Sequence, residues 1–331
     1  MAKDVKVVIE LTKAPAKAGF GFPLILAANQ EKAVAYKEVS SLGEVVTAGF
    51  AETTAVYKAA KLLFMQNDAP STIAVCAATE GAETALNAVI GNGWRQLVVV
   101  DAADDVESIS DYIESSGKHA MYFASVKSTD TATLTAIKGN ERTVAVVYDS
   151  TDEANPEAAV VGATAGLEVG SFTYKNIVVK GVTAQELSDS EVSALHEAGA
   201  ITILLKAGYI VTSEGVTASG EYADIVDSKD YIIEQIEYQC QSLMIRVPKL
   251  PYDNRGIASL EAVVVSVLMD AANNGMIAQN EDGDYAYTVN FGARSECSAS
   301  DISARHYEAG QFSFEQAGAI HTAEVTGSII A

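Results

Sequence analysis

The sequence predicts an α/β domain with a mainly parallel sheet covered by helices on both faces, followed by a smaller α+β domain. Three features of the 331-residue chain support this fold class. Short apolar segments alternate with helical ones over the first two-thirds of the chain, which is typical of parallel sheets. Two long amphipathic segments follow, and strand-like segments at both ends of the chain have no evident partner within it. We expect an N-terminal arm at 1–18, an α/β domain at 19–215, a C-terminal α+β domain at 216–319 and a C-terminal arm strand at 320–331.

The α/β domain is predicted from apolar runs of strand length and from helical repeats between them. The predicted strands are Pro23–Ala28, Tyr36–Val39, Thr72–Ala77, Gln96–Asp101, Ala120–Val126 and Thr143–Tyr148. The predicted helices are Thr53–Met65, Ala82–Ile90, Val106–Ser115 and Thr131–Ile137. We expect Ile201–Leu205 and Tyr209–Thr212 to form a hairpin that closes the domain.

Two further helices are predicted before that hairpin. Pro156 opens the first, since proline is tolerated in the first turn of a helix. Three glycines follow at four-residue spacing, Gly162, Gly166 and Gly170. Without a flanking apolar span of about 20 residues, this spacing indicates close packing of a soluble helix. Ser188 and Glu191 have the spacing of a capping box at the start of the second helix, which runs to Ala198.

The C-terminal domain is organised around the stretch from Gly220 to Ile257. Asp227 and Asp230 have the spacing of a capped helix start. The apolar residues that follow at helical spacing are Ile232, Ile236, Cys240 and Leu243. The sequence therefore predicts a long helix that reaches Met244 and ends before two prolines, Pro248 and Pro251.

The rest of this domain is predicted to be one more helix and two strands. The helix spans Leu260–Asn273, and Gly275 ends it. The strands are Tyr285–Phe291 and Tyr307–Phe314. These strands have no obvious place inside a single subunit.

Both ends of the chain carry apolar strands that are candidates for contacts with neighbouring subunits. In the N-terminal arm the apolar residues alternate with polar ones at Val5, Val7, Ile9 and Leu11. The C-terminal arm has its candidate interface residues at Glu324, Val325, Ile329 and Ile330. An apolar strand is unusual at a chain end, where most proteins are polar and frayed.

The composition excludes several classes of partner. A net charge of −22 argues against binding to nucleic acid, which requires clustered lysine and arginine, and against an anionic membrane surface. Three widely spaced cysteines suggest neither a disulfide framework nor a zinc site, and they suit a reducing cytoplasm. The first residues lack the apolar core of a signal peptide, and we expect no membrane insertion because no apolar run approaches about 18 residues.

No constellation of residues for catalysis is evident. The chain has no phosphate-binding glycine loop, no G-x-S-x-G motif and no H-E-x-x-H motif. Asp224, Asp227 and Asp230 could be imagined as metal ligands, but a helix cap requires fewer assumptions. The Asn280–Asp284 turn resembles the start of a calcium loop, but Phe291 stands where that loop needs a glutamate. We therefore expect no catalytic residue, no cofactor and no metal, although an α/β enzyme of flavodoxin-like or Rossmann-like type and a monomeric ligand-binding domain remain alternatives.

Several segments together resemble one family of proteins. They are Tyr36–Leu42 with the helix Thr53–Met65, Ile177–Val182 with Leu187, Ser188, Glu191, Leu195 and Gly199, Ala218–Asp224 with Asp230–Ile232, Ile245–Tyr252 with Arg255–Ile257, and the apolar terminal strand. The chain in this respect resembles the tail sheath proteins of contractile bacteriophages and phage-tail-like bacteriocins, from Leu24 to Ala331 and most closely after Phe172. It is short for this family and lacks large outer insertions.

The resemblance implies a structural role without enzymatic activity. Such subunits form rings of six stacked helically around a tail tube, and their terminal arms exchange strands with neighbours. Collapse of the sheath drives the tube through the target cell envelope, with the energy stored in the extended packing. The resemblance implies the tail tube protein and the baseplate and tail terminator proteins as partners. It also implies a place in the tail of a virion or phage-tail-like particle assembled in the host cytoplasm.

A basic cluster in this acidic chain is the candidate contact with the tube. Arg246, Lys249 and Arg255 lie at the junction of the two long C-terminal helices. The resemblance implies that the sheath touches the tube through a helix of the C-terminal domain. We therefore expect this junction to face the tube, although an ordinary solvated surface explains the same residues.

Overall fold

The computed structural model describes residues 21–101, 105–149 and 155–326, so the predicted N-terminal arm lies outside the described residues. Its largest element is an eight-stranded sheet in the order β2-β3-β1-β4-β5-β6-β7-β8. The strands are β1 Phe22–Ala27, β2 Val34–Val39, β3 Ile73–Ala77, β4 Trp94–Val100, β5 Met121–Val126, β6 Thr143–Val147, β7 Ala200–Lys206 and β8 Tyr209–Thr212. All six predicted strands and both strands of the predicted hairpin are therefore present, with small shifts at their ends.

The sheet is mainly parallel, as predicted. The inner strand β1 pairs in parallel with β3 and β4, so that Leu24 lies opposite Ala74 on one side and Leu97 on the other. Only the two edge strands run the other way: β2 is antiparallel to β3, and β8 is antiparallel to β7. Inner strands such as β3 and β6 are buried along their whole length, which explains why they read as unbroken apolar runs.

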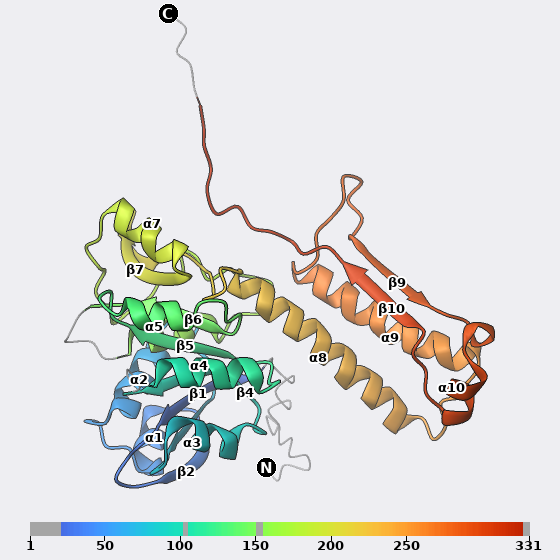
Figure 1. The fold of residues 1–331 in the computed structure, drawn as a ribbon, viewed down its shortest axis with the longest axis horizontal. Coiled ribbons are helices and arrows are strands. Elements are labelled where there is room, and N and C mark those ends of the chain that lie inside the picture. Colours follow the sequence, from blue (N-terminus) through green and yellow to red (C-terminus); the bar gives the residue numbers. More distant parts are fainter. Residues whose placement is uncertain (1–20, 102–104, 150–154, 327–331) are drawn as a thin grey trace, which may run out of the picture.

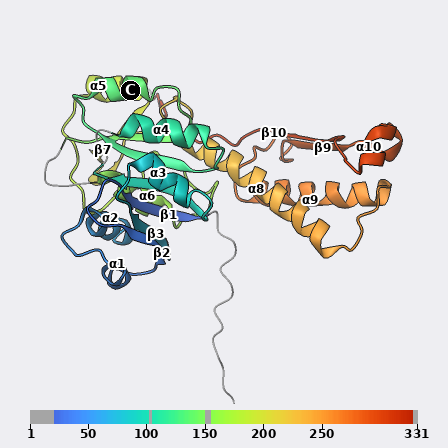
Figure 2. The same ribbon diagram turned by 60° about the horizontal axis from the view of Figure 1, so that its bottom comes forward.

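Helices cover both faces of this sheet, and Figure 2 shows the sheet between the two layers. One layer contains α1 Leu42–Ala48, α2 Ala55–Phe64 and α6 Pro156–Thr164. The other contains α3 Ala82–Val89, α4 Val106–Ser115 and α5 Thr131–Ala136. Helix α7, Asp189–Glu197, lies beside β7. The capping box predicted for α7 is present, because Ser188 accepts from the Glu191 amide and the Glu191 side chain accepts from the Ser188 amide.

The glycine-spaced segment differs from its prediction in one respect. Helix α6 ends at Thr164, so Gly166 and Gly170 lie beyond it. Close packing is nevertheless the reason for the first two glycines. A Cβ atom on Gly162 would lie 2.4 Å from the Leu63 carbonyl oxygen, and one on Gly166 would lie 2.0 Å from the Asp68 carbonyl oxygen. Both positions pack against α2 and the segment after it, where no side chain fits.

Two antiparallel helices and a small sheet make up the C-terminal module, which we define as residues 223–319. Helices α8, Ala223–Arg246, and α9, Asn254–Asn273, lie side by side and project away from the large sheet (Figure 1). Strands β9, Tyr287–Phe291, and β10, Gly310–Phe314, pair antiparallel and are joined through a 3-10 turn, Arg294–Glu296, and α10, Ala299–Ala304.

The interpretation that these two strands have no obvious place inside one subunit was wrong. Alternate residues of β9, namely Tyr287, Val289 and Phe291, pack with Phe314 against a core formed mainly by α9. That core contains Ile232, Val264, Leu268, Ala271, Ala272, Met276 and Ile277. The alternation of apolar and polar residues indicated the strands correctly, but it could not show that α9 covers their apolar face.

The start of α8 also differs from the prediction. The helix begins at Ala223 after Tyr222, and no side chain caps it. Asp227 and Asp230 therefore lie inside the helix and are not its cap. Helix α9 likewise begins earlier than predicted, because Asp253 accepts hydrogen bonds from the amides of Arg255 and Gly256 and starts the helix at Asn254.

Helix α9 bears on the expectation of no membrane insertion, because mean hydropathy over a helix is a broader test than an unbroken apolar run. Its 20 residues have a mean hydropathy of 1.4 over an 18-residue window, and 39% of that window is buried inside the subunit. By length and composition alone this helix could cross a membrane. The core helix of a soluble protein passes the same test, and α9 supplies most of the core of the C-terminal module.

Candidate assembly interface

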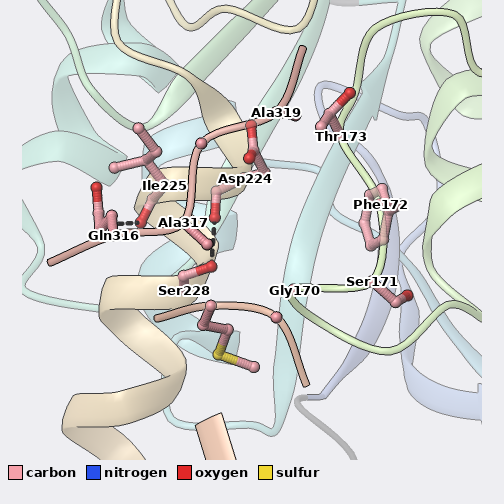
Figure 3. A pocket seen from close by; sticks show the side chains of 13 residues that line it. Gly170, Ser171, Phe172, Thr173, Asp224, Ile225, Ser228, Gln316, Ala317 and Ala319 are labelled. Carbon is pink, nitrogen blue, oxygen red and sulfur yellow. Dashed lines mark hydrogen bonds between the residues drawn. The ribbon is translucent and has the colours of Figure 1, made fainter. Parts of the chain in front are cut away.

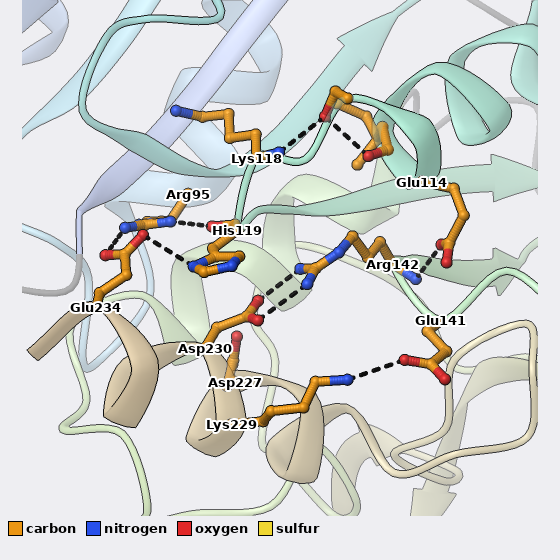
Figure 4. Close-up of polar contacts among 12 residues, drawn as sticks. Arg95, Glu114, Lys118, His119, Glu141, Arg142, Asp227, Lys229, Asp230 and Glu234 are labelled. Atoms are coloured by element: carbon orange, nitrogen blue, oxygen red, sulfur yellow. Dashed lines mark hydrogen bonds and ion pairs between the residues drawn. The ribbon is translucent and has the colours of Figure 1, made fainter. Parts of the chain in front are cut away.

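The junction between the two parts of the chain is an ionic cluster at the amino-terminal edge of the parallel sheet (Figure 4). The basic side chains come from positions where strands begin: Arg95 in β4, His119 before β5 and Arg142 before β6. The acidic side chains come from one face of α8, at helical spacing. We call the following residues the junction cluster: Arg95, His119, Arg142, Asp227, Asp230 and Glu234.

The pair between Arg142 and Asp230 is the most buried contact of this cluster. The two guanidinium nitrogens Nη1 and Nη2 donate to the two carboxylate oxygens at 2.5 and 2.9 Å. The side chains are 14% and 3% exposed. The bond to Asp230 raises the pKa of Arg142. Because the two planar groups meet through two parallel bonds, the pair fixes the direction in which α8 leaves the sheet.

Glu234 forms the second half of the junction cluster one helical turn further along α8. It pairs with the guanidinium of Arg95, and its other oxygen lies 3.3 Å from Nδ1 of His119. Arg95 also donates to the backbone carbonyl of His119. These contacts hold α8 against the starts of β4 and β5, because Glu234 of α8 binds a basic side chain from each of these two positions.

Asp227 differs from its neighbours because its partner is a hydroxyl group. Tyr174 Oη donates to Asp227 Oδ2 at 2.6 Å. Burial raises the pKa of Asp227 to about 7, although the hydrogen bond from Tyr174 and the charge of Arg95 favour its ionised form. Asp224, the third member of the predicted series, lies one turn earlier beside a small cavity. Asp227 and Asp230 thus have different partners, and neither acts as a helix cap.

The arrangement of the junction cluster is suited to fixing the angle between two structural parts. In residues 21–101, 105–149 and 155–326, no group of three or more His, Cys, Asp or Glu side chains is placed to hold a metal ion. Sequence reasoning did not find this cluster, because Arg142 and Asp230 are 88 residues apart and neither carries a local signal.

The small sheet of the C-terminal module has two strands, and no third strand pairs with them in the described part of the chain. Thr288 and Ser313 face solvent and hydrogen bond to each other at 2.7 Å. Phe312 lies opposite Val289 and therefore on the apolar face, but its side chain is 41% exposed. The apolar face is thus incompletely covered along β10.

The described part of the predicted C-terminal arm is extended and, beyond His321, leaves the subunit (Figure 1). Glu324 and Val325 are both exposed, and the Val325 side chain is 93% exposed. Ile320 before them is 91% exposed. The remaining predicted interface residues lie outside the described residues: Val5, Val7, Ile9, Leu11, Ile329 and Ile330.

The three residues of the predicted tube contact are brought together at the tip of the α8–α9 pair. Arg246 is the last residue of α8, Arg255 is in the first turn of α9, and Lys249 lies between the two helices. All three are exposed. Met244 and Ile245 beside them are exposed as well. The tip is therefore a basic and partly apolar projection on an acidic chain.

Comparison with known proteins gave matches only at the level of three-dimensional structure. No protein-family model matches the chain, and no curated protein matches it in sequence. A chain of the anti-feeding prophage baseplate matches with a TM-score of 0.76 and 15% identity, covering 100% of both chains. A chain of an extracellular contractile injection system, the PVC sheath complex in its contracted state, matches with a TM-score of 0.74 and 12% identity over 99% of this chain and 98% of that one.

A crystal structure of a sheath tail protein from Listeria innocua is also similar. It matches with a TM-score of 0.61 and 11% identity, and the alignment covers 83% of this chain and 89% of that chain. Both the α/β part and the C-terminal module are included in the two matches that span almost the whole chain. The chain therefore has the fold of the sheath proteins of contractile injection systems and contractile tails.

Proposed function

We propose that this chain is a contractile sheath subunit that polymerises helically around a tail tube and contracts to drive the tube through a target cell envelope. The observation that carries the proposal is the similarity to chains of a contractile sheath and of a related baseplate over 98–100% of both proteins. A flavodoxin-like or Rossmann-like enzyme would share the parallel sheet. It would not be expected to share the two-helix module, the small sheet and the extended tail as well.

Strand exchange between subunits is supported by the small sheet. The small sheet is supported by α9 on one face, but it has only two strands, so its edges can pair with an added strand. An exposed edge supplies main-chain hydrogen bonds, and alternating side chains give the added strand its register. The exposed Phe312 on the apolar face of β10 is a surface that an arriving apolar strand would bury.

The arms supply strands with suitable chemistry. Val325, and by sequence Ile329 and Ile330, give one apolar side to the C-terminal arm. Burying each such side chain contributes about 1.5–3 kcal/mol before the entropy of ordering the arm is subtracted. Each added main-chain hydrogen bond contributes about 1 kcal/mol net. An arm of about eight residues therefore gains enough to hold a neighbour, and a contact that does not close on itself gives an open helix of subunits.

Electron microscopy of the purified protein tests the proposal. A sheath subunit is expected to form hollow tubes at high protein and salt concentration. An enzyme or a ligand-binding monomer would give single particles about the size of one chain under every condition. Single particles throughout would overturn the proposal.

Deleting either arm tests strand exchange. Removing 5–11 or 324–330 is expected to abolish tubes and leave the thermal midpoint of the subunit unchanged, because the arms would be buried only in neighbours. Circular dichroism melting and micrographs of both truncations are the measurements. Unfolded truncations would mean that the arms pack on their own subunit, and tubes without arms would mean that another contact holds the sheath.

The partners follow from this role. The basic tip at Arg246, Lys249 and Arg255 is the proposed contact with the tube protein. Its exposure and its position at the end of a projecting helix pair support that assignment. Baseplate and terminator proteins would meet the first and last rings, in the tail of a virion or phage-tail-like particle.

A further inference from the structure

The segment that follows β10 crosses from the C-terminal module to the α/β domain, and we call residues 315–321 the strap. Its first half remains on the module. The Ala278 amide donates to the Glu315 carbonyl at 2.9 Å, and the Ala317 amide donates to the Met276 carbonyl at 3.0 Å. Gln316 Nε2 also lies 3.4 Å from the Ile225 carbonyl in the first turn of α8. The strap is thus attached to the module at its start.

The other end of the strap is attached to the α/β domain through His321. Its buried Nδ1 atom lies 3.1 Å from Glu214 Oε1, a charge contact without hydrogen-bond geometry, and both side chains are only 14% exposed. The imidazole ring packs edge-to-face against Tyr222, with ring centroids 4.9 Å apart. Lys175 holds the second oxygen of Glu214 at 2.6 Å. His321 therefore contacts a glutamate that is already held in place by its ion pair with Lys175.

The pattern of exposure singles out His321 within the tail. From residue 318 to residue 326 every side chain is exposed except this one. Tyr222, which packs on it, lies immediately before α8, so the site is where the two parts of the chain join. An exposed tail that buries one side chain against an ion pair has a defined point of attachment.

Between its two attached ends the strap spans a cavity of about 270 Å³ (Figure 3). After Gln316, the strap residues over this space are small: Ala317, Gly318 and Ala319. Asp224 lies at the cavity with one carboxylate oxygen buried and without a hydrogen-bond partner, and burial raises its pKa. The middle of the strap thus fills little of the space beneath it, and its position depends on the ends.

We propose that the strap stays with the subunit that carries it, and that His321 is the anchor from which the exchangeable part of the C-terminal arm begins. This inference rests on the strand exchange proposed above. The exchangeable part is then residues 322–331, which include the predicted strand 324–330. When a neighbour pulls on the arm, the contact of His321 with Glu214 transmits the force to the α/β domain, where Lys175 holds Glu214. The force does not reach the small sheet that receives a neighbour's strand.

The anchor has a measurable consequence for assembly. Without it, the free arm would begin after the bonds at Gln316 and Ala317 and would include residues 318–331. The effective concentration of a tethered group falls roughly with the −3/2 power of tether length. Without the anchor, the tether before the predicted strand 324–330 lengthens from 322–323 to 318–323, about threefold, which should raise the critical concentration for polymerisation about fivefold.

Spin labelling of the free subunit tests the anchor directly. Ala323→Cys in a Cys240→Ser, Cys297→Ser background places a nitroxide two residues beyond His321, and Cys76 is buried. At low salt, where the subunit is dispersed, we expect slow motion of the label. His321→Ala and Glu214→Gln should each speed its rotation at least threefold. The matched control is Glu308→Gln, which removes the exposed pair with His306 at 3.8 Å elsewhere in the module and should change nothing.

The outcomes separate this inference from the proposed function. A label that is as mobile in the parent as in His321→Ala overturns the anchor, whether or not tubes form. Glu214→Gln also disturbs Lys175, so His321→Ala, which leaves the pair of Lys175 and Glu214 in place, decides the matter if the other variant misfolds. A restrained label in a parent protein that never forms tubes would support the anchor and count against the sheath function. A critical concentration that is unchanged in His321→Ala would contradict the proposed role in assembly.

Discussion

The pair between Arg142 and Asp230 should be the strongest single polar contact between the α/β domain and α8. Two hydrogen bonds join the side chains, and both are largely buried. Removing one partner leaves a buried charge without compensation, which costs about 3–5 kcal/mol. We therefore expect Arg142→Ala and Asp230→Ala each to lower the free energy of unfolding by about 3 kcal/mol. The double variant should cost much less than the sum, with a coupling energy of about 2 kcal/mol or more.

The neighbouring positions provide a matched control. Lys229 and Glu141 form an ion pair at 3.0 Å, but their side chains are 44% and 49% exposed. Exposed pairs contribute about 0–1 kcal/mol because water screens them. Urea unfolding can be followed by the fluorescence of Trp94, the single tryptophan, which is fully buried beside Arg95. A coupling energy for Arg142 and Asp230 no larger than that of the control pair would refute the account of the junction.

Three other predictions concern charge. Glu157 is 1% exposed, and burial raises its pKa from 4.5 to about 8. Between these two pH values the Glu157 carboxyl is protonated in the folded state and ionised in the unfolded state. The free energy of unfolding therefore falls as the pH rises through this range. Glu157→Gln should therefore raise the free energy of unfolding by about 1–2 kcal/mol at pH 7 and by less at pH 5. Urea unfolding at both pH values measures this difference, and equal effects at the two values would contradict it. Salt should promote polymerisation, because the −22 charges of neighbouring subunits repel each other and are screened beyond about 10 Å at 0.1 M salt; light scattering that stays monomeric across a salt series would refute it. Lys249→Glu with Arg255→Glu should leave tubes intact but reduce co-sedimentation with the tube protein, and unchanged co-sedimentation would count against the tube contact.

The local elements could be predicted from the sequence because their signals are local. The strands of the large sheet are buried on both faces, so β3 and β6 appear as apolar runs bounded by polar segments. The Ser188–Glu191 capping box needs only residues three apart. The hairpin of β7 and β8 likewise follows from neighbouring segments.

The contacts that join distant segments could not be predicted in this way. Asp230 has the same local spacing whether it caps a helix or pairs with Arg142, and only the folded chain brings that arginine to it. The attachment of His321 to Glu214 joins residues with no pattern between them. The covering of β9 by α9 depends on the crossing of two elements, whereas alternation within β9 reports only that one of its faces is apolar.

A helical reconstruction of the purified polymer by cryo-electron microscopy tests the central claim most directly. Strand exchange predicts that the β9–β10 pair is continued into a larger sheet by residues 324–330 of one neighbour and residues 5–11 of another. A polymer in which this pair remains two-stranded, with both arms packed on their own subunit, would contradict it.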